Sequence, residues 1–317
     1  MDENKFMGCL LGAAVGDAIG LPVEGLAPER AQRLFGPLTQ HRLFLGRGFV
    51  SDDTAHALMT AQALVASGGE PERFGRELAC RLRLWFLSLP PGVGLATARA
   101  CLKLLVGFSY KNAGVFSAGN GPAMRAPIIG LFCAADPDDT RLRALVRVST
   151  RLTHTDPQAE EGALAIARAT TSSPFAARNE RLPEGVASCA SWGRPVSGYI
   201  VHTVAAALAL TARHPDNLRD AVIETVALGG DTDTVAAIVG GLVGAWVGRD
   251  GIPTDWLAGL IEPWWSEQRI AKLARQCAEV AASRTPQRPD RNFWLATHTL
   301  LWPIVLFHGF RRLFPPY

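Results

Sequence analysis

Apolar residues recur at helical spacing along most of the chain. The clearest segments with apolar positions three and four residues apart are 6–15, 54–66, 71–87, 96–105, 159–170, 201–213, 218–228 and 234–247. No clear run of strict apolar–polar alternation, the pattern of a half-buried strand, interrupts them. The pattern therefore predicts an all-α fold with little or no sheet.

Loops rich in glycine, proline and asparagine separate these predicted helices, but none resembles a domain linker before about Ser283. One helical domain is therefore expected over residues 1–283. Residues 284–317 form a polar, proline-interrupted linker and then an apolar, aromatic tail. The tail is too short to span a membrane and predicts a helix docked on the domain or on a second subunit, with a membrane-surface contact as the alternative.

The composition narrows the class of protein. Of 317 residues, 48% are hydrophobic and 19% are charged, which suits a large buried core. The net charge of +3 is too small to predict stable nucleic-acid binding. Six cysteines without a CxxC pair predict buried free thiols, and an acidic N-terminus lacks the basic start of a signal peptide. Together these features favour a cytoplasmic protein.

Two acidic clusters of the same design lie about 180 residues apart in the chain. The first, at 51–54, reads Ser-Asp-Asp-Thr, and the second, at 231–234, reads Asp-Thr-Asp-Thr after two glycines. Each opens a predicted helix, so each alone could be a helix N-cap. Carboxylates this close repel one another unless protons or cations neutralise them, and Asp and Ser/Thr oxygens suit Mg²⁺ or Mn²⁺. If the fold joins the clusters, they predict a two-metal hydrolytic centre.

A third acidic element supports this interpretation. Asp17 and Glu24 lie in an apolar, glycine-rich segment, where an unpaired buried carboxylate would be costly. Asp17 either caps backbone amides or contacts the site, whereas Glu24 is the better candidate for a site residue.

These segments resemble the ADP-ribosylglycohydrolase family, which includes the dinitrogenase reductase-activating glycohydrolases. The resemblance covers about residues 6–250, in the family's order. It is carried by 8–12 with Gly16, Asp17 and Glu24, and by 51–54, 119–121, 123–125, 152–155, 201–204 and 229–234. The most specific element is the Gly-Gly-Asp-Thr-Asp-Thr sequence at 229–234.

The resemblance implies a compact orthogonal helical bundle with a binuclear cleft that holds two divalent cations, Mg²⁺ or Mn²⁺. The implied metal ligands are Ser51, Asp52, Asp53, Asp231, Asp233 and Thr234. The implied catalytic residues are Glu24, Asp53 and Asp231. The implied substrate contacts are Asp17, Ser117, Ala118, Gly119, Asn120, Gly121, Met124 and His154, because the family wraps a diphosphate in the 117–121 loop and has a histidine in its cleft.

One departure from the family concerns the general base. Some bacterial members carry an Asp in the loop after the Trp-containing helix, where this chain has Gly92. The base must then be Glu24, a metal-ligating Asp such as Asp53, or water activated by the ions.

The resemblance predicts a metal-dependent hydrolase that cleaves the linkage at C1″ of the distal ribose and removes ADP-ribose from a protein, nucleic acid or small molecule. Two alternatives remain open. One is an ADP-ribose-binding protein of the same fold with impaired catalysis, and the other is a hydrolase of a different nucleotide or glycoside. The leaving group is not determined by the sequence, although the loops around 107–125 and 185–200 are expected to decide it.

Overall fold

The computed structural model describes residues 2–171, 195–261, 267–290 and 294–311. Within these ranges the chain is helical, with isolated β-bridges and no β-strand, so the all-α prediction is confirmed. The helices are α1 (Glu3–Gly20), α2 (Pro28–Phe35), α3 (Asp52–Ser67), α4 (Pro71–Leu87), α5 (Leu95–Leu105), α6 (Ala126–Cys133), α7 (Thr140–Arg151), α8 (Pro157–Thr171), α11 (Ile200–Arg213), α12 (Leu218–Ala227), α13 (Thr232–Val247), α14 (Thr254–Gly259), α15 (Glu267–Ser283) and α16 (Trp294–Arg311).

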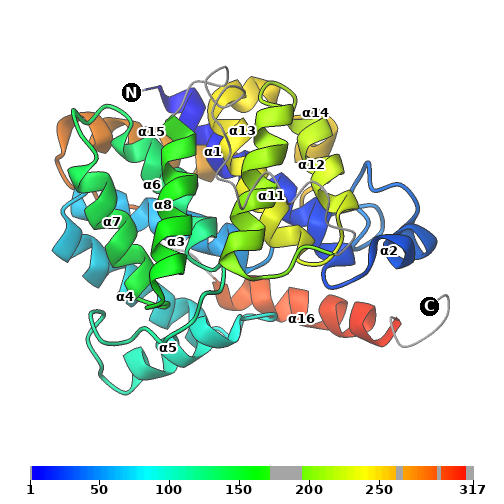
Figure 1. Cartoon of the computed structure of the whole chain (residues 1–317), viewed down its shortest axis with the longest axis horizontal. Coiled ribbons are helices and arrows are strands. Elements are labelled where there is room, and N and C mark those ends of the chain that lie inside the picture. The colour runs from blue at the N-terminus through cyan, green and yellow to red at the C-terminus, as the bar shows by residue number, and fades with distance from the viewer. Residues whose placement is uncertain (1, 172–194, 262–266, 291–293, 312–317) are drawn as a thin grey trace.

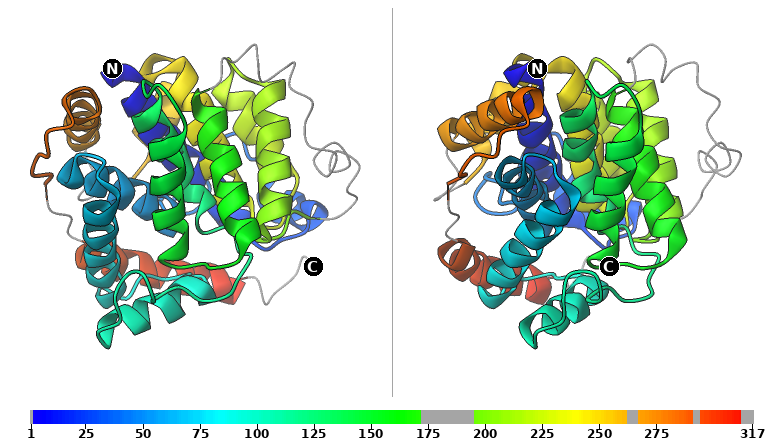
Figure 2. Two further views of the ribbon diagram at one scale, coloured as in Figure 1. Left: turned by 60° about the vertical axis from the view of Figure 1, so that its left-hand side comes forward. Right: turned by 90° about the vertical axis from the view of Figure 1, so that its left-hand side faces the viewer.

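Helix α1 runs through the centre of the bundle and packs along α13 (Figure 1). It is long and apolar enough to cross a membrane by length and composition, but most of its surface is buried by neighbouring helices. Helices α6, α7, α8 and α11 pack beside one another on one side of this central pair (Figure 2). Helix α16 lies along the opposite edge from the N-terminus, next to α5.

Small residues at every fourth position allow α1 and α13 to touch through their backbones. Gly8, Gly12 and Gly16 of α1 face Gly244, Gly240 and Ala236 of α13, and a Cβ at any of the three α1 positions would lie 2.1 Å from a carbonyl oxygen of α13. No side chain can separate the helices at this crossing. Because α13 begins at one acidic cluster and the C-terminal end of α1 carries Asp17, this contact sets the distance between acidic elements.

Gly12→Ala should therefore destabilise the protein by about 3 kcal/mol, since the added methyl group would have to displace the backbone of α13. Gly241→Ala is the matched control. Its Cβ would meet Pro127 at 3.4 Å, an ordinary contact, and alanine favours a helix interior over glycine. Urea denaturation of both variants measures the difference, and equal stability would show that the close contact is not needed.

The cysteines were expected to be buried free thiols. Cys9, Cys101, Cys133 and Cys277 are buried and free, whereas Cys80 on α4 is free but exposed. Cys189 lies outside the described residues.

Candidate metal centre and cleft

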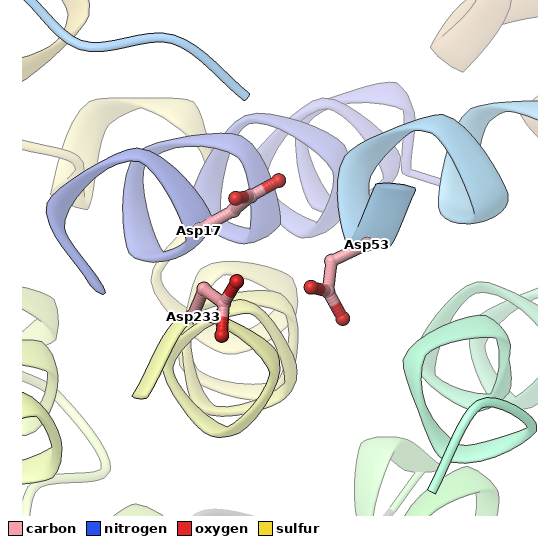
Figure 3. Close-up of side chains that lie close together, drawn as sticks. All are labelled: Asp17, Asp53 and Asp233. Carbon is pink, nitrogen blue, oxygen red and sulfur yellow. The ribbon is translucent and has the colours of Figure 1, made fainter. Parts of the chain in front are cut away.

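Three helices bring buried carboxylates together at one point. Asp17 comes from α1, Asp53 from the first turn of α3 and Asp233 from the first turn of α13, and a ligand oxygen of each lies within 4.8 Å of the others (Figure 3). Glu24, Asp231 and Asp233 form a second group with the same spacing. The two groups share Asp233, which is the arrangement expected when one carboxylate lies between two cation positions.

Two glycines direct the chain into the second cluster. Gly229 and Gly230 have φ values of +67° and +82°, which are strained for other residues, and a Cβ at Gly230 would lie 2.0 Å from the carbonyl oxygen of Val196. The Gly25 N–H donates to the Gly230 carbonyl at 2.7 Å, so the turn that carries Glu24 is bonded directly beside Asp231. These backbone contacts explain how Glu24 reaches a cluster 207 positions later in the chain.

Asp17 organises the start of α3. Its Oδ2 accepts from the Ser51 N–H at 2.8 Å, from the Thr54 N–H at 3.1 Å and from the Thr54 hydroxyl at 2.5 Å. Asp17 is fully buried and does not line the cleft. Its predicted role as a substrate contact therefore finds no support in this position, which matches the capping alternative instead.

Asp17→Ala should cost about 3 kcal/mol of folding stability, because three donors at the start of α3, two of them buried, lose their acceptor. Asp17→Asn retains one acceptor oxygen and should cost less. Urea denaturation compares the two variants, and a loss below about 0.5 kcal/mol in Asp17→Ala, the range of surface substitutions, would contradict the capping role.

The remaining carboxylates of the centre are oriented by neutral donors. The Asp53 Oδ2 accepts from the Ser51 hydroxyl at 3.0 Å and from the Thr234 hydroxyl at 3.3 Å. The Asp231 Oδ2 accepts from the Asn120 amide at 2.5 Å, and Asn120 also donates to the Thr203 hydroxyl at 2.9 Å. Thr203 was not singled out as a site residue, although the 201–204 motif contains it.

Divalent cations fit this donor set. The buried Asp17 Oδ1 and Asp53 Oδ1 have no hydrogen-bond partner, and in the described ranges no lysine or arginine forms an ion pair with Asp17, Asp53 or Asp233. Buried carboxylates that lack a cation are costly, and oxygen-only ligand sets suit Mg²⁺ or Mn²⁺. The hydroxyls of Ser51 and Thr234 lie beside Asp53, and Asp52 and Asp53 border the cleft.

Crowding raises the pKa values of these acids. Burial raises the pKa of Asp17 to about 6, although hydrogen bonds from Thr54 and Ser51 oppose it. Burial, with the charges of Asp17 and Glu24, raises the pKa of Asp52 to about 8. Burial and neighbouring carboxylates also hold the pKa values of Asp53 and Asp233 well above their ordinary range.

Without metal, the protein should lose stability as the pH rises from about 4 to about 8. In this window the folded state keeps protons on Asp17 and Asp52 that the unfolded chain, with Asp pKa values near 3.9, has already released. The free energy of unfolding then falls with each pH unit until the folded-state pKa values are passed. Urea denaturation in EDTA at pH 5, 6.5 and 8 measures this slope, and saturating Mn²⁺ should flatten it. A pH-independent stability in EDTA would contradict the raised pKa values.

Five of the acidic residues line a cavity of about 570 Å³, namely Glu24, Asp52, Asp53, Asp231 and Asp233. The cavity is also lined by six residues that the sequence analysis proposed as substrate contacts: Ser117, Gly119, Asn120, Gly121, Met124 and His154. Ala118 does not line the cavity, and its carbonyl accepts from the Ile200 N–H at 2.9 Å. Thr97, Val196, Ser197 and Gly198 also line the cavity, although no sequence motif identified these residues individually. The predicted specificity segment 185–200 lies outside the described residues up to position 194.

His154 faces the glycines of the 117–121 loop, with its Nε2 3.1 Å from the Cβ that a side chain at Gly119 would carry. Burial, and then the charge of Arg125, lowers the pKa of His154 to about 3, so the imidazole is neutral. Arg125 donates to the Thr153 hydroxyl at 2.8 Å, and this oxygen lies 2.8 Å from His154 Nδ1 but 3.5 Å from the Thr150 carbonyl. The Thr153 hydroxyl therefore donates its single proton to His154 Nδ1, which acts as the acceptor, so that Nε2 carries the imidazole proton and is a donor on the cleft side.

Comparisons with known proteins agree with this geometry. Residues 1–287 match the model of the ADP-ribosylglycohydrolase family. The chain is 30% identical over 301 residues to an uncharacterized protein of Archaeoglobus fulgidus, which covers 86% of this chain and 96% of that protein. It is 28% identical over 279 residues to the ADP-ribosyl-[dinitrogen reductase] glycohydrolase of Rhodospirillum rubrum, with 81% and 90% of the two chains covered.

A solved structure described as an ADP-ribosylglycohydrolase-related protein complex superposes with a TM-score of 0.69 at 30% identity, and covers 88% of this chain and 98% of that one. The sequence match spans every acidic element of the centre, and the structural match shows the same all-α architecture. The chain belongs to the ADP-ribosylglycohydrolase family of hydrolases.

Proposed function

We propose that this protein hydrolyses the bond between C1″ of an ADP-ribosyl group and a modified protein side chain, with two divalent cations in the cleft. The observation that carries the proposal is the pair of carboxylate groups that share Asp233, because four of their five members line a 570 Å³ cavity: Glu24, Asp53, Asp231 and Asp233. The 117–121 loop lies on the same cavity, where its backbone can approach an anionic diphosphate. The Rhodospirillum rubrum relative, an ADP-ribosyl-[dinitrogen reductase] glycohydrolase, is named for an ADP-ribosylated protein, which supports a protein substrate.

Asp17, Asp53 and Asp233 would hold one cation, and Glu24, Asp231 and Asp233 the other. When bound, such ions draw substrate hydroxyls and a water together and lower the pKa of that water. Asn120 keeps Asp231 Oδ2 in place, while Ser51 and Thr234 do the same for Asp53. Side chains held by hydrogen bonds in this way keep the reacting groups aligned.

Glu24 is the side chain best placed to move the proton. It is exposed and lines the cavity, whereas Asp53 is buried and Asp231 is half-buried. Gly92 lines the same cleft and offers no carboxylate. In the proposed step Glu24 accepts a proton from water, the water oxygen bonds to C1″, and the bond from C1″ to the leaving group breaks. The leaving atom then takes up the proton that Glu24 accepted, which restores the carboxylate.

The decisive experiment is a substrate panel assayed for released ADP-ribose in Mg²⁺, Mn²⁺ and chelator. The panel contains peptides ADP-ribosylated on arginine or serine, an ADP-ribosylated nucleic-acid end and an acetyl ester of ADP-ribose. Release from a modified peptide in the metal-containing arms, lost in Glu24→Gln, supports the proposal. Binding of ADP-ribose without release from any substrate would instead identify a binding protein, and release from the non-protein substrates alone would overturn the protein-substrate assignment.

A further inference from the structure

Helix α16 lies beyond the family match, which ends at residue 287, yet it contacts segments that lead into the cleft. A small void shows how close the two are, because it is bordered by Ser51 and Asp52, by Pro90 and Pro91, and by His298 of α16. Ser51 and Asp52 open the first acidic cluster. Pro90 and Pro91 precede Gly92, which lines the cleft wall together with the start of α5. The helix therefore contacts both segments that lead into the site.

The segment between α4 and the cleft wall contains a strained residue. Leu89 has a φ of +55°, in the left-handed region that costs an ordinary residue roughly 1–2 kcal/mol. Its side chain is 69% exposed, so burial of the leucine does not offset that cost. A conformation of this kind persists when surrounding contacts determine it.

Two side chains of α16 provide those contacts. The Trp302 indole N–H donates to the Leu89 carbonyl at 2.8 Å. His298 is buried, and its Nδ1 lies 3.0 Å from the Ser88 carbonyl and 2.9 Å from the Ser88 hydroxyl. The Ser88 hydroxyl donates to the Trp85 carbonyl at 2.5 Å, so both Ser88 oxygens act as acceptors and Nδ1 must carry the proton.

The other end of α16 is tied to the segment before the first acidic cluster. His308 bonds to the Leu43 carbonyl, and Leu301 is buried against Leu43 and Phe49. Because Phe49 is followed within two residues by Ser51, the helix supports the chain on both sides of the small void.

We infer that α16 positions the cleft, with His298 and Trp302 as positioning residues that hold the strained 88–89 turn and so fix the wall from Gly92 to Thr97. Neither residue lines the cavity, so their effect reaches the substrate only through that wall. The inference rests on the proposed function for what the cleft binds.

The test uses full-length variants that remove one donor each. Trp302→Phe removes the indole N–H but keeps an aromatic ring, and His298→Ala removes the Nδ1 donor. Hydrogen exchange of peptides over 88–97 should become about fivefold faster in each, the ratio that one typical hydrogen bond contributes. The KM for the ADP-ribosylated peptide and the Kd for ADP-ribose should rise by a similar factor, while kcat changes less than twofold, because the metal ligands are untouched.

Three further variants separate a positioning role from an unspecific loss of structure. Leu306→Gln alters an exposed residue of the same helix and should leave exchange and KM unchanged. His298→Asn supplies an amide donor in place of Nδ1 and should recover most of the exchange protection and substrate affinity that His298→Ala loses. Leu89→Asn, combined with Trp302→Phe, should also return the exchange rate and the KM toward their wild-type values, since asparagine tolerates the left-handed region better than leucine.

The inference would be overturned if the rate of hydrogen exchange over residues 88–97 were unchanged in both Trp302→Phe and His298→Ala. An equal loss in Leu306→Gln, or a fall in kcat as large as the rise in KM, would do so as well. If the wild-type protein releases ADP-ribose from no substrate, the proposed function fails, whereas the exchange comparison and the ADP-ribose Kd still decide whether α16 positions the wall.

Discussion

Asp233→Asn should reduce kcat by about 1,000-fold or more and at the same time make the metal-free protein more stable. Asp233 belongs to both carboxylate groups, so the variant removes a ligand from both proposed cation positions. Charge stabilisation by bound cations is worth several kcal/mol in a transition state, which corresponds to about three orders of magnitude. The rise in stability follows because burial and the charges of Glu24, Asp53 and Asp231 hold the pKa of Asp233 well above its ordinary range.

The asparagine keeps the oxygen that accepts the Thr234 N–H at 3.0 Å, so the first turn of α13 retains its hydrogen bond. Turnover of the best peptide substrate and thermal unfolding in EDTA at pH 8 measure the two effects. Asp250→Asn, an exposed position just after α13, controls for the loss of one negative charge. A variant that loses activity together with stability would indicate a structural role for Asp233 instead.

Removal of divalent cations should abolish activity, and their return should restore it and stabilise the fold. A ligand that binds only the folded state contributes about 2.7 kcal/mol at 100 times its Kd, which raises the Tm of a chain of this size by about 5 °C. The cause is the neutralisation of the buried carboxylates of Asp17, Asp53 and Asp233, with which no arginine or lysine of the described residues forms an ion pair.

Activity after EDTA treatment and dialysis, followed by titration with Mg²⁺ or Mn²⁺, tests this expectation. Equilibrium dialysis with Mn²⁺ should give two ions per chain in the wild type and fewer in Asp233→Asn. The Tm of Asp233→Asn should not rise when Mn²⁺ is added. Full activity in chelator, or one ion per chain at saturation, would contradict the binuclear centre.

Local sequence patterns anticipated most of the helices. The segment predicted over 54–66 is α3, which runs from Asp52 to Ser67. It starts two residues earlier because the Ser51 hydroxyl accepts from the Asp53 N–H at 3.2 Å and Asp17 adds two further backbone bonds. The first of these is a local cap that the sequence suggests, whereas the second comes from another helix.

The site residues also divide into those that a local sequence pattern identifies and those that only contacts between distant segments place. The two acidic clusters were visible because four adjacent residues concentrate carboxylates and hydroxyls, and the resemblance to a known family identified their order. Asp17 illustrates the limit. Its sequence context required a partner for a buried carboxylate, but the choice between a helix cap and a substrate contact depended on the position of Ser51 and Thr54, which lie more than 30 residues away.

The sequence by itself determined the all-α class, the family and the residue types able to hold hard cations, because these depend on periodicity and on motifs within a few neighbouring residues. Only the tertiary structure decided that Asp233 is shared by two carboxylate groups, that Glu24 is bonded beside Asp231 through Gly25 and Gly230, and that α16 supports the cleft wall. The physical reason is that these relations arise from backbone contacts between segments far apart in the chain, such as the glycine crossing of α1 and α13, which no local pattern specifies.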